Sequence, residues 1–210
     1  GKPAMLVPRL PGQHPEHPNA TQCRAIGAAL ARLHGVDIPT PTPLPDDRTL
    51  MARWLSELPD GADRRHAGEQ LQQWQALPGP RVLVHADLFR DNALFDGDRL
   101  TGLLDFYHAC HDHPAYDLAV AINDWCVDPH GEPRPDHQAA LLAGYESGRP
   151  LTLEERNALP LALAVAALRF WLSRLAGQHQ QALSGPGSKD PAPFHRLWRR
   201  RSAALGEDAA

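Results

Sequence analysis

The sequence predicts an α+β protein that is mainly α-helical and carries one small β-hairpin. Apolar residues recur at three- and four-residue steps over most of the chain, which is the period of helices that bury one face. Short apolar runs around an Asp-Gly-Asp turn occur in one place, over residues 82–106, and predict the hairpin. The 210 residues are 42% hydrophobic and 22% charged, the composition of a globular chain long enough to bury a sizeable core.

The first helix is expected to begin after the capping candidates Asn19 and Thr21 and to end at His34-Gly35. Residues 36–45 contain four prolines and predict an extended connector. Thr152 and Glu155 have the spacing of a capping box, for which we expect only a short turn. Further helices are expected over Thr49–Leu58, Ala62–Leu77, Ala115–Cys126, Asp136–Ser147, Pro160–Leu183 and Pro193–Leu205, with Trp54 and Trp74 facing inward and Pro160 in a first turn.

Charge and cysteine content exclude several classes of protein. Lys and Arg number 21 against 25 Asp and Glu, a net charge of −4 that argues against a general nucleic-acid binder. The three cysteines, Cys23, Cys110 and Cys126, show no paired spacing, which favours the reducing cytoplasm over a disulfide framework. The most apolar stretch, Leu161–Ala176, contains two arginines and predicts a buried helix, not a membrane span. We expect no membrane partner.

Ionisable residues of interest gather on the hairpin. The pattern predicts strands at Val82–Val84, Ala93–Phe95 and Leu100–Phe106, and a polar loop over His85–Asn92. Residues His108–His113 are expected to form a partly exposed loop. The His and Cys residues of this loop lie within six positions, whereas a structural zinc site usually has two separated pairs of ligands.

The polar loop has the residue types that phosphoryl transfer needs. The reaction requires a carboxylate beside the attacking hydroxyl and oxygen ligands for Mg²⁺ on the phosphates. Asp87, Asn92 and Asp105 supply these groups, and a loop followed by a hairpin brings them to a common end. His85 is expected to brace the loop instead of reacting. The spacing H-x-D-x-x-x-x-N before a strand and a later Asp is specific.

Four blocks in the same order resemble the aminoglycoside phosphotransferase/choline kinase-like superfamily, whose members are relatives of protein kinases. More narrowly, they resemble the homoserine kinases of that superfamily, and the similarity runs across essentially the whole chain. The blocks are His85–Phe89, Leu104–Tyr107, Tyr116–Ala119 and Asn123–Cys126. The resemblance implies the C-terminal lobe of a protein-kinase-like fold and the use of ATP and Mg²⁺ to phosphorylate the side-chain hydroxyl of L-homoserine, a step in threonine biosynthesis.

The resemblance also implies roles for individual residues. Asp87 would be the catalytic base, and Asn92 and Asp105 would be the Mg²⁺ ligands. Leu94 would form the floor of the adenine pocket, and backbone groups at Val7–Leu10 would bind the adenine edge.

Other positions are implied as supports or as parts of the acceptor pocket. Asp117 would hold the catalytic loop, as the N-cap of its helix. His108 departs from the family, where an aromatic residue is expected. The acceptor pocket is expected near Tyr107, Tyr116, Asn123 and Trp125.

The family's N-terminal lobe is not found in this sequence. Residues 1–12 would be the hinge strand and linker, and residues 13–210 the C-terminal lobe. The lobe's phosphate-covering loop and strand lysine are not found, so we expect little or no turnover by the isolated chain.

Several alternatives stay open. The acceptor could instead be choline, a thioribose sugar or an aminoglycoside. The sequence does not indicate the aromatic cage that choline would need or the strongly acidic cleft that an aminoglycoside would need. The chain could also be a non-catalytic remnant that binds a nucleotide or a partner. The basic run His195–Arg201 is expected to be a solvated helix face.

Overall fold

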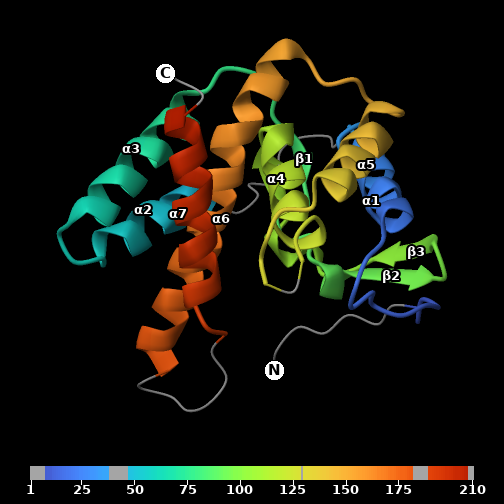
Figure 1. Ribbon diagram of the computed structural model, residues 1–210, viewed down its shortest axis with the longest axis horizontal. Helices are drawn as coiled ribbons and strands as arrows, with labels where there is room; N and C mark the ends of the chain where they lie inside the picture. Colours follow the sequence, from blue (N-terminus) through green and yellow to red (C-terminus); the bar gives the residue numbers. More distant parts are fainter. Residues whose placement is uncertain (1–7, 38–46, 129, 182–188, 208–210) are drawn as a thin grey trace.

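The computed structural model describes residues 8–37, 47–128, 130–181 and 189–207, and within them the protein is mainly helical, as predicted (Figure 1). Six of the helices lie within two residues of their predicted bounds at each end, and Asn19 caps the first with a capping box. Residues 1–7 of the predicted hinge strand and nearly all of the connector at 36–45 lie outside the described residues. The helices are α1 (Ala20–Leu33), α2 (Asp47–Ser56), α3 (Ala62–Ala76), α4 (Pro114–Trp125), α5 (Pro135–Glu146), α6 (Leu153–Gln181) and α7 (Ala192–Glu207).

The four described strands form two separate antiparallel pairs. Strand β2 (Ala93–Asp96) pairs with β3 (Arg99–Leu103) in the predicted hairpin, and β1 (Val82–Val84) pairs with β4 (Cys110–Asp112). Strand β4 corrects the expectation of a loop at residues 108–113, because backbone pairing with β1 makes this segment extended. Likewise β3 ends three residues before Phe106, because Asp105 takes a left-handed conformation with φ 60° and a short turn follows.

Helix α4 lies near the centre of the molecule, and nearly all of its side chains are buried. Helix α6 packs between α4 and α7, with apolar residues on most of its surface, as expected for a core helix. By length and composition α6 could cross a membrane, but 67% of its most apolar window is buried inside the protein. The predicted burial of Leu161–Ala176 is therefore confirmed.

Helix α6 begins earlier than predicted. Glu155 N–H donates to the Thr152 side-chain oxygen at 3.2 Å, and Thr152 N–H donates to the Glu155 carboxylate at 3.0 Å, so the capping box starts the long helix itself. Pro160 consequently lies inside the helix instead of in its first turn. The proline removes one backbone hydrogen bond, but Ala158, Leu159 and Ala162 around it remain buried in the core.

Helices α1 and α5 touch at two glycines. A Cβ on Gly27 would lie 1.9 Å from the carbonyl oxygen of Leu141, and a Cβ on Gly144 would lie 2.0 Å from that of Arg24. Only glycine permits this backbone approach. Of the two tryptophans expected to face inward, Trp74 is fully buried and Trp54 is half-buried.

Candidate active site

The polar loop His85–Asn92 is fastened to helix α4 by a buried carboxylate. Asp117 accepts hydrogen bonds from the backbone N–H of His85 at 2.7 Å and of Ala86 at 2.9 Å. The loop needs this support because Ala86 has a φ of 63°, a strained value for a residue with a side chain. Asp117 does not cap its helix as predicted. His113 caps α4, and Asp117 lies one turn inside it.

The same face of α4 holds the rest of the loop. Trp125 donates its indole N–H to the carbonyl oxygen of Leu88 at 3.0 Å, and the Asp124 carboxylate accepts from the backbone N–H of Arg90 at 2.7 Å. Asp124 also binds the Arg90 guanidinium at 3.1 Å. Residues 117, 124 and 125 are separated by seven and eight positions, which is the spacing of one helix face.

A buried histidine that sequence reasoning missed completes the support. His34, which caps the C-terminal end of α1, lies with its Nε2 3.2 Å from the Asp117 carboxylate and its Nδ1 2.8 Å from the Tyr145 hydroxyl. Burial raises the pKa of Asp117, but the hydrogen bond and charge of His34, with the charge and backbone N–H of His85, hold it below its usual range. Asp117 is therefore a carboxylate in the folded protein.

His85 connects the two halves of the site. Its Nε2 lies 2.8 Å from the carbonyl oxygen of Leu104 and donates to it, while Nδ1 accepts from the backbone N–H of Asp87 at 3.3 Å. The ring also packs against Phe106, with centroids 4.5 Å apart. These contacts join the loop to the segment that carries Asp105, and the ring is fully buried.

The structure brings Asp87, Asn92 and Asp105 to one region. Asn92 donates its amide N–H to the backbone oxygen of Asp87 at 2.7 Å, which leaves the amide oxygen as its acceptor group. Leu104 N–H donates to the Asn92 carbonyl at 2.9 Å, so Asp105 follows directly, and its charge contributes to a raised Asp87 pKa. The described residues contain no cluster of three or more His, Cys, Asp or Glu that could hold a metal, but the Asp105 carboxylate and the Asn92 amide oxygen are ligand types that suit Mg²⁺.

An arginine from α6 lies beside Asp87. The Arg169 guanidinium is 4% exposed, and its Nη1 lies 3.7 Å from the Asp87 carboxylate. Burial raises the pKa of Asp87 above its usual range, and Arg169 is the largest of the charges that oppose this rise. The sequence presented Arg169 only as an interruption of an apolar stretch.

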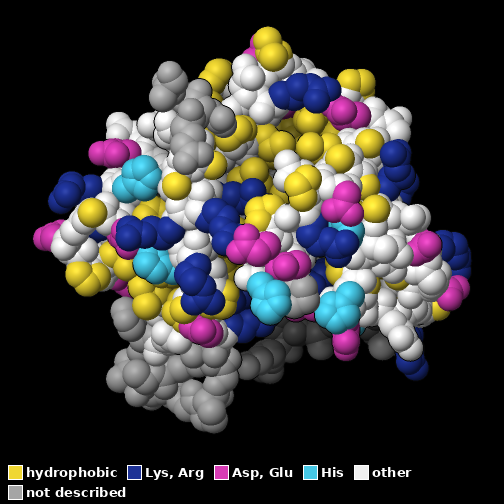
Figure 2. All heavy atoms as spheres, viewed as in Figure 1, with side chains coloured by type: hydrophobic (Ala, Val, Ile, Leu, Met, Phe, Trp, Pro, Cys, Tyr) yellow, Lys and Arg dark blue, Asp and Glu magenta, His cyan; other side chains and the backbone are white. Residues whose placement is uncertain are grey.

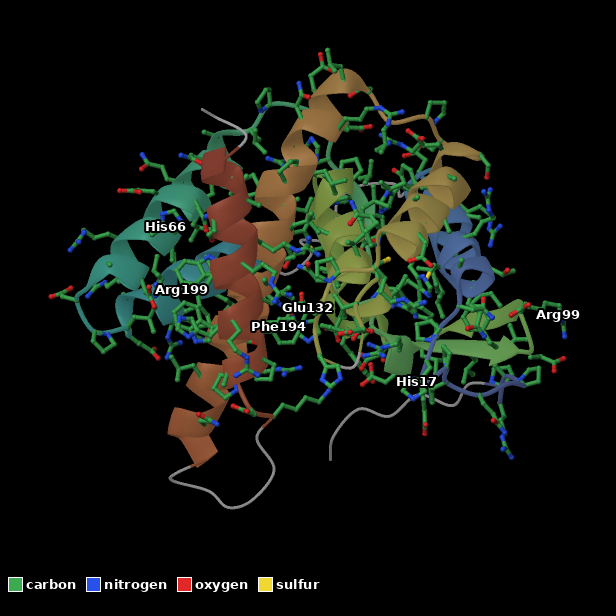
Figure 3. The ribbon with its side chains drawn as sticks, viewed as in Figure 1. His17, His66, Arg99, Glu132, Phe194 and Arg199 are labelled. Atoms are coloured by element: carbon green, nitrogen blue, oxygen red, sulfur yellow. The ribbon has the colours of Figure 1, made fainter. Side chains whose placement is uncertain are left out.

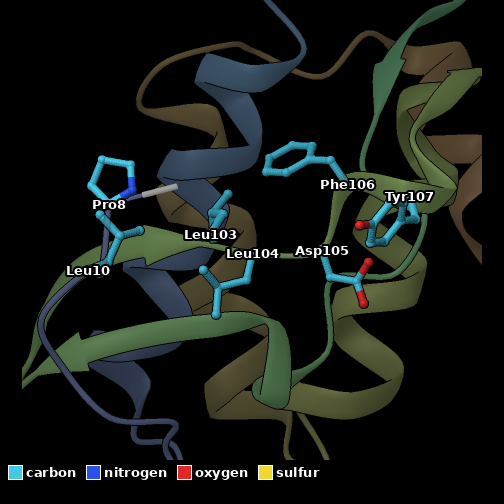
Figure 4. Close-up of a pocket in the computed structure, with 7 residues that line it drawn as sticks. All are labelled: Pro8, Leu10, Leu103, Leu104, Asp105, Phe106 and Tyr107. Carbon is cyan, nitrogen blue, oxygen red and sulfur yellow. The ribbon is translucent and has the colours of Figure 1, made fainter. Parts of the chain in front are cut away.

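A cavity of about 480 Å³ opens beside Asp105 (Figure 4). Pro8 and Leu10 lie on one side of it, and Phe106 and Tyr107 lie on the other. Its wall is mostly apolar, as suits a flat aromatic base. The lining residues are Pro8, Leu10, Leu103, Leu104, Asp105, Phe106 and Tyr107.

Leu94, which is expected at the floor of the adenine pocket, is not among the residues that line this cavity. It pairs with Gly102 across the hairpin, and the Leu10 side chain packs over Gly102, within 2.3 Å of where a Cβ would be. Leu10, Leu103 and Leu104 provide the apolar surface instead. Of the backbone expected to meet the adenine edge, residues 8–10 border the cavity, while Val7 lies outside the described residues.

The four residues expected at the acceptor pocket are not brought together. Tyr107 is 82% exposed at the cavity just described. Tyr116 is buried against Trp74, and Trp125 is fully buried beneath the loop, so both are core residues. Asn123 borders a second cavity, on the side of α7.

A hairpin on a helical lobe, with an Asp-x₄-Asn loop before it and an Asp after it, defines a kinase-like phosphotransferase lobe. The comparisons with known proteins agree. Residues 1–151 match the Phosphotransferase enzyme family (APH), and the chain belongs to that family. A homoserine kinase from Pseudomonas aeruginosa is 42% identical over 98% of this chain and 68% of its own length. One from Methylobacillus glycogenes is 42% identical over 97% of the chain and 67% of its length.

Solved structures show the same fold. A choline/ethanolamine kinase family protein from Mesorhizobium loti has a TM-score of 0.66 at 21% identity, covering 89% of this chain and 61% of that one. A choline kinase from Streptococcus pneumoniae has a TM-score of 0.63 at 16% identity, covering 90% and 64%. The chain therefore spans about two thirds of the length of the proteins that it resembles.

Proposed function

We propose that this chain is the catalytic lobe of a kinase that transfers the γ-phosphoryl group of ATP to the side-chain hydroxyl of L-homoserine. Relatives that are 40–42% identical to it are named homoserine kinases. The structural observation that carries the choice of acceptor is the cationic surroundings of Asp87. Buried Arg169 lies 3.7 Å away, and half-buried Arg174, one and a half turns along α6, interacts electrostatically with the same carboxylate.

These cations favour an acceptor that carries a carboxylate. Choline and aminoglycosides are themselves cations, which the positive potential at Asp87 would repel. Homoserine is a zwitterion, so its carboxylate can lie on the positively charged side of the site while its hydroxyl faces Asp87. An uncharged thioribose sugar gains nothing from them. The local charge thus supports the amino-acid acceptor over the three alternatives.

In the proposed mechanism Asp87 orients the acceptor hydroxyl and accepts its proton. Its partial burial raises its pKa toward neutrality, which makes it a stronger proton acceptor than an exposed carboxylate. Asn92 and Asp105 would hold Mg²⁺, which would offset the negative charge of the phosphates. Asp117 and His85 keep the loop in place and do not touch the reactants.

The apolar cavity beside Asp105 is the proposed site of the adenine base. Residues 1–12 are then the hinge to a preceding lobe that covers the phosphates, and residues 13–210 form the lobe that holds the acceptor. We further propose a cytoplasmic enzyme, since its substrates are cytoplasmic metabolites.

The test is ADP release by the full-length protein, with L-homoserine, choline, methylthioribose and kanamycin as acceptors. We expect turnover with L-homoserine, and a loss of roughly 10²- to 10⁴-fold in kcat for Asp87→Asn. Asp91→Asn, an exposed carboxylate in the same loop, is the matched control and should retain activity. Preference for another acceptor would refute the substrate, and ATP binding without turnover would favour a non-catalytic remnant.

A further inference from the structure

A second cavity, of about 460 Å³, lies between the N-terminal half of α7 and the loop that follows α4. Glu132 and Phe194, which line it, lie side by side near the centre of the view in Figure 3. In Figure 2 this central region carries basic and acidic side chains close together. The cavity shares no lining residue with the apolar cavity beside Asp105.

The cavity adjoins the catalytic loop. Arg90, three residues after Asp87, lines it and is fixed there by Asp124. Phe194 also lines it, and its ring lies 6.0 Å from that of Phe89 in the same loop. A ligand held in this cavity therefore lies beside the loop that presents the base.

Charged side chains of both signs line the cavity. Arg196 and Arg200 lie four residues apart on α7, so they share one face of the helix, where two like charges repel each other. Asp128 and Glu132 belong to the loop after α4. Glu132 pairs with Arg200, whereas Arg196 has no ion pair or hydrogen bond within the described part of the chain.

A buried cation lies next to this wall. Arg201 donates from Nε to the Asn123 side-chain oxygen at 3.1 Å, and Asn123 borders the cavity. One Nη of Arg201 is buried and has no hydrogen-bond acceptor among the described residues. No carboxylate balances this guanidinium in the described region, which adds positive potential on the α7 side.

We propose that this cavity binds the charged end of the acceptor. The carboxylate of an α-amino acid would contact Arg196 and Arg200, and its ammonium would face Asp128 and Glu132. This assignment rests on the proposed function, and it names the residues that would select an amino acid among small alcohols. A zwitterion matches both walls, whereas a simple cation or anion matches only one.

The test pairs single variants with acceptors that lack one charge. L-Homoserine carries both charged groups, 4-hydroxybutanoate lacks the ammonium, and 3-aminopropan-1-ol lacks the carboxylate. In the full-length protein, Arg196→Gln should raise KM for the first two by roughly 10- to 100-fold and leave KM for 3-aminopropan-1-ol unchanged. Glu132→Gln should raise KM for L-homoserine and 3-aminopropan-1-ol but not for 4-hydroxybutanoate.

The control is Arg199→Gln, which makes the same charge change on α7 at a residue that pairs with Asp63 away from the cavity. It should leave all three KM values unchanged. If Arg196→Gln changes KM equally for all three acceptors, or for none of them, the proposed binding site is wrong. Turnover with L-homoserine would still support the proposed function in that case.

If the wild-type protein does not phosphorylate L-homoserine, the proposed function fails, and calorimetric titration with the same three compounds decides about the cavity. The site is supported if Arg196→Gln weakens binding of the two compounds that carry a carboxylate and Glu132→Gln weakens binding of the two that carry an ammonium. No binding of L-homoserine or 4-hydroxybutanoate to the wild-type protein overturns it.

Discussion

Replacing Asp117 by Asn should destabilise the protein strongly, because no orientation of an amide satisfies the groups around it. One Asp117 oxygen accepts from the backbone N–H of His85 and from His34, and the other accepts from the backbone N–H of Ala86. An amide has a single acceptor oxygen, so its NH₂ must face at least one buried N–H. An unsatisfied buried donor costs about 1–3 kcal/mol, and the loss of charge weakens the remaining bonds, for a total of roughly 3 kcal/mol.

The assay is urea unfolding followed by tryptophan fluorescence, since Trp74, Trp125 and Trp198 are buried. A loss of roughly 3 kcal/mol should lower the urea concentration at the unfolding midpoint without changing the m-value, and it should lower Tm by roughly 6–12 °C. Asp91→Asn is the control, because its ion pair with Lys189 is exposed and worth less than about 1 kcal/mol. A loss below about 1 kcal/mol for the Asp117 variant would refute the reasoning.

Three further predictions concern pH, electrostatics and packing. The pKa of Asp117 is lower in the folded protein than in the unfolded chain, where it is about 3.9. The contribution of Asp117 to stability is therefore complete above the unfolded pKa and is lost as pH falls through the folded pKa. In unfolding titrations with acid, the difference in the free energy of unfolding between the wild-type protein and Asp117→Asn should shrink. Arg169→Met removes the main charge that opposes the raised pKa of Asp87, so the acidic limb of kcat/KM in the full-length protein should move to higher pH; an unmoved limb would contradict the electrostatic role. Gly144→Ala should cost about 1–3 kcal/mol or more, because its Cβ would overlap Arg24, whereas Gly177→Ala, with open space around it, should be neutral or stabilising in the same denaturation assay.

The sequence was sufficient for the elements with a strong local signal. Periodicity located the helices, and the Asp-Gly-Asp turn located the hairpin. The end of β3 and the existence of β4 were missed because neither depends on local pattern. Residues 110–112 are extended through pairing with β1, which lies 26–30 residues away for the paired positions. Asp105 ends β3 early by adopting a left-handed conformation that Gly or Asn favours more.

The site divides in the same way. The spacing of Asp87, Asn92 and Asp105 was sufficient to predict that the three side chains lie in one region, because a short loop and a hairpin determine their relative positions. The partners His34 and Arg169 lie 83 and 82 residues away from the carboxylates that they contact, so only helix packing reveals them. Leu94, predicted at the floor of the adenine pocket, is not among the residues that line the cavity beside Asp105. The hairpin register shifts between Leu94 and Phe95, and the sequence does not show that Leu10 covers the opposite residue.

Three helices make different contributions to the proposed site, and this separates the expected phenotypes. Helix α4 holds the backbone of the loop, so its variants should change stability. Helix α6 places Arg169 against Asp87, the proposed base, so its variants should change the pH dependence of the rate. Helix α7 presents Arg196 to the second cavity, so its variants should change KM for carboxylate-bearing acceptors. Because Asp117, Arg169 and Arg196 contact different groups, their effects on the free energies should be nearly additive. Strong coupling between the α6 and α7 variants would mean that both arginines bind the same carboxylate.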